Sequence, residues 1–229
     1  MGLNEKFFAS AAAAAELYNP VNSYDACNTD SYPEFGTTWF DITDNGNDGT
    51  LNGATWNSDC YFDFDGSNDF IDFGDMQGFG NELTVSAWIN PDSTQNAYAT
   101  VYDFEHTNDE GWAMYQNNTI TNNYKIALKE GSVWDSTANI SLTADTWHHI
   151  VFTVDSSNNF ELYVNNTNTQ SLQNWTGLGT AERRLNLGCW GATTGTNRSR
   201  FWNGQISKFG IYNRDLTPTE ITALYNQGR

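Results

Sequence analysis

Alternating hydrophobic and polar positions dominate the chain after about residue 20, and they predict β-strands. The pattern is clearest in residues 61–65, where Phe62 and Phe64 share one face. It recurs in residues 83–89, 149–154, 160–164 and 206–212. The polar residues 155–159 favour a hairpin connection between two of these segments. Short strands separated by turn residues are typical of an all-β sandwich or barrel.

One helix is predicted near the end of the chain, with roughly two to three turns. The segment Thr217-Pro218-Thr219-Glu220 combines a capping box with proline at the first helical position. Ile221, Leu224 and Tyr225 follow at helical spacing, and Gly228 can end the helix. We expect this short C-terminal helix to pack one face on the sandwich.

Residues 1–20 differ in composition from the rest of the chain, because they are rich in alanine. We interpret residues 1–20 as a partly helical N-terminal arm that docks on a neighbouring chain, and residues 21–229 as one domain. A signal peptide is an alternative, although Glu5 cancels the charge of Lys6 and leaves the start of the segment barely basic. A disordered tail is a further alternative.

The charge balance narrows the classes of partner. The 229 residues contain 28 Asp and Glu against 10 Lys and Arg, which gives a formal net charge of −18. This excess of acid argues against nucleic-acid binding and against adhesion to anionic membranes. No apolar run reaches the ~20 residues that a transmembrane helix needs, so no membrane insertion is expected.

Three cysteines, Cys27, Cys60 and Cys189, stand at wide spacing without a Cys-x-x-Cys motif. We interpret them as three small buried or half-buried thiols. One disulfide with a free thiol is the alternative, and the sequence does not decide between the two.

Five segments resemble motifs of laminin-G-like domains in the concanavalin A-like lectin/glucanase superfamily, in the order of that family. The closing signature matches residues 204–221, GQISKFGIYNRDLTPTEI. A Trp-x-His strand matches residues 147–151, and the entry motif matches residues 64–71, FDGSNDFI. Upstream, residues 25–33 and 36–51 resemble the first strands of a subgroup found in structural proteins of tailed, often marine, phages. The resemblance implies a jelly roll of two antiparallel sheets that binds or scaffolds glycans or proteins.

Related glycosidases carry a Glu-x-Asp-x-Glu strand, whose nearest match here is Val101-Tyr102-Asp103-Phe104-Glu105. Valine cannot attack an anomeric carbon, so no catalytic residue is assigned and no enzymatic activity is expected.

Metal binding has weak support in the sequence. His148 and His149 are adjacent on a strand and point to opposite faces, so they cannot share an ion, and His106 stands apart. We expect one of the adjacent pair in the core and the other at the surface. The resemblance implies a structural calcium ion, with Asp65 and Asp69 as candidate ligands. Relatives often carry Asp where this chain has Ser207, which weakens that expectation.

Tryptophans are the main candidates for a sugar platform. Trp88 and Trp147 match core positions of the family, Trp39 and Trp56 are interpreted as packing residues, and Trp112 is left open. The glycan-binding candidates are the tryptophans beside loop residues, with polar neighbours as hydrogen-bonding partners: Trp134, Trp175, Trp190, Trp202, Asn174, Asn197 and Arg198.

Two functional interpretations follow. The first is a non-enzymatic virion structural protein, on the capsid surface or tail, that displays a lectin-like jelly roll in many copies. Residues 1–20 would then bind other virion proteins. The second is a secreted bacterial carbohydrate-binding or adhesion module.

Overall fold

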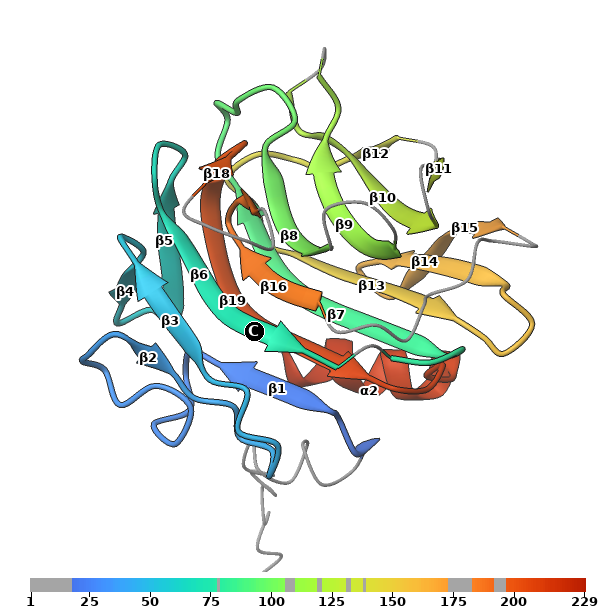
Figure 1. Cartoon of the computed structure of the whole chain (residues 1–229), viewed down its shortest axis with the longest axis horizontal. Coiled ribbons are helices and arrows are strands. Elements are labelled where there is room, and N and C mark those ends of the chain that lie inside the picture. The colour runs from blue at the N-terminus through green and yellow to red at the C-terminus, as the bar shows by residue number, and fades with distance from the viewer. Residues whose placement is uncertain are drawn as a thin grey trace, which may run out of the picture.

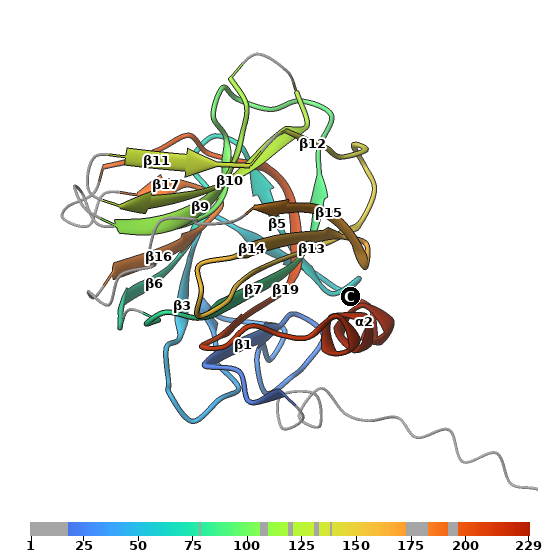
Figure 2. The same cartoon turned by 90° about the vertical axis from the view of Figure 1, so that its right-hand side faces the viewer.

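The computed structural model describes residues 18–77, 79–105, 110–118, 121–130, 133–137, 139–172, 183–191 and 197–229. Within these ranges the chain forms a jelly-roll sandwich of two antiparallel sheets with one C-terminal helix (Figures 1 and 2). The predicted fold class is therefore confirmed. Residues 1–17 of the predicted arm lie outside the described residues, and the division between arm and domain stays a prediction.

The first sheet has eight strands in the described part of the chain. Seven of them follow in the order β15 (Thr167–Leu172), β14 (Phe160–Val164), β13 (His148–Val154), β7 (Leu83–Pro91), β19 (Asn203–Tyr212), β5 (Tyr61–Asp65) and β4 (Thr55–Asn57). The eighth strand, β1 (Asn22–Asp25), pairs with β19.

The second sheet has nine strands in the same ranges. Eight of them follow in the order β11 (Val133–Ser136), β10 (Asn123–Glu130), β9 (Glu110–Gln116), β8 (Thr100–Glu105), β16 (Arg183–Leu187), β6 (Phe70–Met76), β3 (Gly49–Asn52) and β2 (Thr38–Trp39). The ninth strand, β12 (Ile140–Ser141), pairs with β10. A separate ribbon of β17 (Trp190–Gly191) and β18 (Arg198–Ser199) follows β16.

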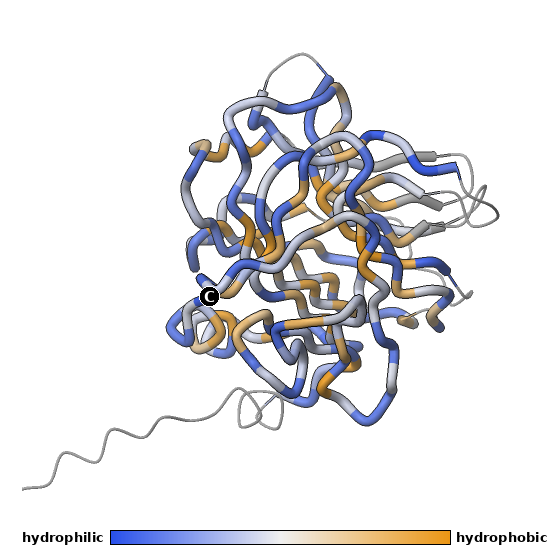
Figure 3. The backbone as a smooth tube through the Cα atoms, turned by 90° about the vertical axis from the view of Figure 1, so that its left-hand side faces the viewer, coloured by the Kyte–Doolittle hydropathy of each residue, from blue (hydrophilic) through white to orange (hydrophobic). Residues whose placement is uncertain are grey.

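The strands form because apolar side chains alternate with polar ones, which Figure 3 shows as alternating orange and blue along the tube. Phe62 and Phe64 of β5 point into the core, as predicted. Trp112 joins the two sheets, because its ring lies 5.0 Å from that of Phe104 in β8 and 5.9 Å from that of Phe152 in β13. Trp112, left open from the sequence, is therefore a core residue.

Helix α2 (Pro218–Gln227) covers the outer face of the eight-stranded sheet (Figure 2). Its capping box is present at Thr217 and Glu220, and Gly228 caps its C-terminus, as predicted. A second apolar cluster joins the helix to the sheet and includes Tyr18, Val151, Tyr163, Tyr212, Leu216 and Ile221. This cover explains why β13 is buried on both faces rather than on alternate residues. No helix among the described residues is both long and apolar enough to cross a membrane.

Both adjacent histidines are buried, so the expectation of one surface histidine is wrong. His148 donates a 3.0 Å hydrogen bond from Nε2 to the Thr143 carbonyl, which requires the tautomer protonated at Nε2. His149 lies beneath α2, stacked on Trp88 with ring centroids 5.0 Å apart, and its Nε2 is 2.9 Å from Ser86 Oγ. Burial lowers the pKa of His149 to about 3, with a smaller contribution from the charge of Lys208.

Cys27 and Cys60 form a disulfide, and Cys189 is a buried free thiol. The interpretation of three thiols is therefore wrong, and the alternative with one bridge is correct. The two bridged residues come from the segment after β1 and the turn between β4 and β5, which pairing with β19 brings together. Burial raises the pKa of the Cys189 thiol well above its ordinary value.

Candidate functional site

The outer face of the nine-stranded sheet is the candidate site, because α2 leaves this face uncovered (Figures 1 and 2). Strand register places one row of residues across it: Asp72 pairs with Asn186, Asn186 with Asp103, and Asp103 with Ala113. Ala127 of β10 continues the row beyond Ala113. The row is therefore polar on β6, β16 and β8, and consists of alanines on β9 and β10.

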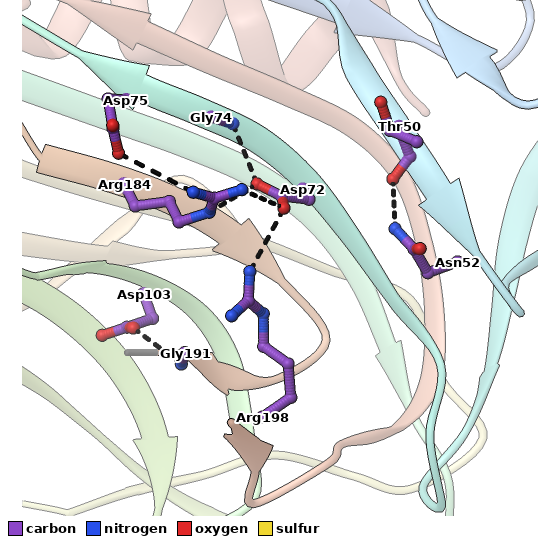
Figure 4. A network of polar contacts seen from close by, with 9 residues as sticks. All are labelled: Thr50, Asn52, Asp72, Gly74, Asp75, Asp103, Arg184, Gly191 and Arg198. Carbon is purple, nitrogen blue, oxygen red and sulfur yellow. Dashed lines mark hydrogen bonds and ion pairs between the residues drawn. The ribbon is translucent and has the colours of Figure 1, made fainter. Parts of the chain in front are cut away.

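Asp72 is the centre of an ion-pair network (Figure 4). Arg184 donates to both of its carboxylate oxygens, from Nε at 2.9 Å and from Nη2 at 2.5 Å, and Arg198 Nη2 lies 3.1 Å away. The Gly74 amide also donates to Asp72 at 2.9 Å. Burial acts to raise the pKa of Asp72, but the bonds from Arg184 and Gly74 and the two positive charges outweigh it, and the pKa is lowered. Asp72 therefore stays ionised and holds both guanidinium groups in place.

The β17–β18 ribbon covers the middle of the row. The Gly191 amide donates a 3.2 Å hydrogen bond to Asp103, and both Asp103 and Asn186 are fully buried. A Cβ at Gly191 would stand 2.6 Å from the Asn186 side-chain nitrogen, so only glycine lets the ribbon approach this closely. The ribbon thereby divides the face into two parts.

A groove with a volume of about 640 Å³ lies on the Asp72 side of the ribbon, within the usual range of small-molecule sites. Its two aromatic walls are Phe70 and Phe201, and the Arg198 guanidinium lies 5.1 Å from the centroid of Phe70. Its other lining residues are Asn52, Gly53, Asn68, Asp72 and Arg184. We call this the Phe70 groove.

The predicted glycan residues do not form one cluster in the described structure. Arg198 lies in the Phe70 groove, Asn197 is exposed just before β18, and Trp190 is half-buried on β17. Trp202 is fully buried, and its indole nitrogen donates a 3.0 Å hydrogen bond to Tyr124 Oη. Trp202 therefore has no ring face for a sugar, and its assignment to the glycan site is corrected to the core.

The remaining candidates cannot be placed. Trp134 belongs to β11, where its backbone pairs with Lys129, but its side chain lies outside the described part of the structure. Asn174 and Trp175 fall in residues 173–182, which lie outside the described residues. His106 falls in residues 106–109, which are also outside them.

The other tryptophans serve packing. Trp39 is fully buried, and the Trp56 indole donates a 3.0 Å hydrogen bond to the Ala26 carbonyl. Trp88 stacks between His149 and Tyr225, with ring centroids 5.0 and 5.7 Å away.

Sequence reasoning named Arg198 but missed Phe70, Phe201 and Arg184, which also line the Phe70 groove. Phe70 follows the candidate calcium residues directly, and Arg184 is preceded by another arginine in a chain poor in cations. Those local signals exist, but Asp72 and Arg198 are 126 residues apart, and only the fold shows that they meet.

Asp65 and Asp69, the candidate calcium ligands, are linked to each other by a hydrogen bond. Asp69 is buried and accepts from the Asp65 amide at 3.0 Å, and burial raises the pKa of its carboxyl, as does the charge of Asp65. Ser207, at the position where relatives carry Asp, donates instead to the Cys60 carbonyl at 2.7 Å. Across the described ranges, no three His, Cys, Asp or Glu residues gather as metal ligands. Calcium binding stays a prediction.

Comparisons with known proteins agree with this fold. A family model described as "Concanavalin A-like lectin/glucanases superfamily" matches residues 65–222. Domain 4 of AbnA, a GH43 extracellular arabinanase from Geobacillus stearothermophilus solved with arabinotriose, has a TM-score of 0.66 and 19% identity. That match covers 90% of this chain and 98% of the arabinanase domain. No curated protein sequence matches the chain significantly.

Botulinum neurotoxin binding domains also share the fold. The serotype D binding domain has a TM-score of 0.67 and 16% identity over 91% of this chain. The serotype D domain in complex with N-acetylneuraminic acid has a TM-score of 0.68 and 15% identity over 94% of this chain. The chain spans about half the length of these domains, 52% and 53%. At these identities the likeness establishes the fold alone.

Proposed function

Since the chain belongs to the concanavalin A-like lectin/glucanase superfamily, we propose that it is a non-enzymatic, lectin-like module that binds glycans in the Phe70 groove. The groove carries the proposal, because it combines aromatic rings with fixed polar groups on an uncovered sheet. A sugar presents apolar C–H faces and a ring of hydroxyls, and both need partners at one site. Phe70 and Phe201 supply the apolar contacts, while amides and charged groups supply the hydrogen bonds.

The fixed positions of the polar groups favour selective binding. Arg184 and Arg198 are both held by Asp72, with 27% and 7% of their side chains exposed. Little side-chain entropy remains to be lost when a ligand binds to groups that are already ordered. Two neighbours in fold were solved with arabinotriose and N-acetylneuraminic acid, which supports a sugar as the ligand class.

The carboxylates of this face support a binding role rather than hydrolysis. A retaining glycosidase needs a nucleophile and a general acid about 5–5.5 Å apart. Asp72 is tied into two ion pairs with a lowered pKa, which suits neither a nucleophile nor an acid. Asp103 is fully buried beneath Gly191, away from any substrate.

Glycan-array binding of the full chain tests the proposal. Phe201→Ala should remove an aromatic wall and weaken binding of the best neutral glycan by about tenfold, because one lost apolar contact of this size is worth on the order of 1–2 kcal/mol. Phe35→Ala is the matched control, since Phe35 is 75% exposed and lies outside the groove. Equal loss in both variants, or no glycan bound by the parent chain, would refute the proposal.

We further propose that the module is displayed in many copies on a virion surface, docked through its N-terminal segment. The resemblance of residues 25–51 to phage structural proteins supports this, and so does the acidic composition, which suits an exposed, soluble shell. The Cys27–Cys60 disulfide supports an oxidising location, where such bonds persist. Multivalent display would compensate for weak single-site affinity.

A secreted bacterial adhesion module is the alternative that the same disulfide and groove favour equally. Sedimentation of the full chain beside a variant lacking residues 1–17 separates the two. Assembly, or binding to purified particles, that is lost with residues 1–17 supports the virion interpretation. Identical monomers that bind no particle would overturn it and leave the secreted module.

A further inference from the structure

Arg200 is a cation without an acidic partner among the described residues of a strongly acidic chain. The chain has 10 Lys and Arg against 28 Asp and Glu, and ion pairs with acids hold Arg184, Arg198, Lys208 and Arg214. Arg200 is exposed, yet its guanidinium forms no ion pair with any residue that the structure describes. An unpaired arginine amid such an excess of carboxylates is the observation that we develop.

Two aromatic rings hold the Arg200 guanidinium. Its central carbon lies 4.9 Å from the centroid of Trp190 and 5.4 Å from that of Tyr98. Tyr98 is 40% exposed, and its ring lies 6.5 Å from that of Tyr115 on β9. Register pairs Tyr115 with Lys125 of β10, which places a second cation on the same row. We call Tyr98, Tyr115, Trp190 and Arg200 the Arg200 cage.

The backbone that carries the cage is fixed in an uncommon conformation. Tyr98 and Arg200 both have positive φ, +59° and +56°, although neither is glycine. Left-handed backbone costs a non-glycine residue roughly 1 kcal/mol, so the surrounding contacts must hold it in place. Thr100 ties the two segments together, because its amide donates to the Arg200 carbonyl at 2.8 Å and its hydroxyl donates to the Tyr98 carbonyl at 3.0 Å.

The arrangement leaves the edge of the guanidinium available. Aromatic rings contact the flat faces of an arginine, while its N–H donors point outward in the plane and match a carboxylate in a two-pronged contact. None of these donors bonds to a protein acceptor within the described ranges. A planar, singly charged acid can therefore bind without displacing any partner.

We propose that the Arg200 cage is a subsite for an acidic sugar, one glycan unit that bears a single carboxylate. The proposal rests on the proposed function and names its ligand class. Arg198 lines the Phe70 groove and Arg200 forms the cage, and the Cα atoms of these two residues, two positions apart in the chain, are at most about 7 Å apart. One oligosaccharide can place a neutral unit in the groove and its acidic unit in the cage. The net charge of −18 disfavours a dense polyanion at the same place.

Nuclear magnetic resonance titration of the full chain tests the proposal with defined probes. Glucuronate, its methyl ester, glucose and inorganic phosphate are titrated at constant ionic strength, and the Trp190 indole signal reports on the cage. We expect glucuronate to shift this signal at a concentration at which the ester and glucose do not. Arg200→Gln should weaken glucuronate binding by about tenfold or more, and Arg200→Lys by less.

Arg229→Gln is the matched control, because Arg229 also lies over an indole, 4.6 Å from the centroid of Trp147, away from the cage. Its glucuronate affinity should be unchanged. Equal affinity for glucuronate and its ester, an Arg200→Gln variant that binds as well as the parent, or phosphate binding as tight as glucuronate would each overturn the proposal. The ester comparison needs no variant, so it holds even if a substitution unfolds the chain. The proposed function of the Phe70 groove is tested separately, by the binding of neutral glycans to the parent chain and to Phe201→Ala.

Discussion

The Cys27–Cys60 disulfide gives a stability prediction whose size follows from the chain it closes. The bridged residues are 33 apart, and the chain-entropy relation for a loop of this length gives about 4 kcal/mol at 25 °C. For a domain of this size each kcal/mol shifts the melting temperature by roughly 2–4 °C, so reduction should lower it by about 8–16 °C. The Cys27→Ser/Cys60→Ser double variant should reproduce that shift.

Differential scanning calorimetry with and without a phosphine reductant measures the effect. Cys27 is exposed, so reduction does not require unfolding, and thiol titration of the native protein confirms it. Cys189 is buried and should react only after denaturation. Adding reductant to the double variant should change nothing. A fully reduced parent protein that melts within about 2 °C of the oxidised one would refute the loop-entropy reasoning.

Three further changes test the packing of the fold. His149 has a folded pKa of about 3, below its ordinary value of 6.5, so the folded state binds fewer protons than the unfolded state between these values. The contribution of His149 to the free energy of unfolding is complete above pH 6.5 and is lost as the pH falls toward 3, by about 1.4 kcal/mol per pH unit. In the His149→Gln variant, the free energy of unfolding measured in urea should therefore fall less steeply with pH over this range. Trp202→Phe leaves Tyr124 Oη without its indole donor and should cost about 1–3 kcal/mol in urea unfolding, with glycan binding unchanged. Thr217→Ala removes the helix cap and should cost about 1 kcal/mol by the same assay, whereas exposed Thr219→Ala should cost less than about 0.5 kcal/mol.

Local rules predicted the elements because the causes of those elements are local. The alternation around Phe62 and the capping box at Thr217 each lie within a few residues, and both appear where expected. The same rules do not show which way a side chain points at the start of a strand. Trp202 directly precedes β19 beside polar residues, yet its amide donates to the Gly188 carbonyl and its ring enters the core.

The candidate site was harder to predict because its contacts join distant parts of the chain. Asp72 meets Arg184 and Arg198 across 112 and 126 residues, and no spacing in the sequence encodes those pairs. The cage has the same character, since Tyr98 and Arg200 come from different connections between strands. Only the whole topology, which sets both the sheet register and the course of the connections, brings these side chains together.

The helix on one outer face gives the sandwich a front and a back. Tyr18 packs beside α2 on the back, while the Phe70 groove and the Arg200 cage are on the front. A molecule tethered through its N-terminal side therefore points both sites at the solution, and neighbouring tethered copies present them in parallel. Attaching the protein to a surface through its lysine amines would turn both sites toward that surface. The reason is that two of the four lysines, Lys125 and Lys129, lie on β10 of the front sheet. Surface-binding measurements on this protein should therefore be oriented by a terminal tag.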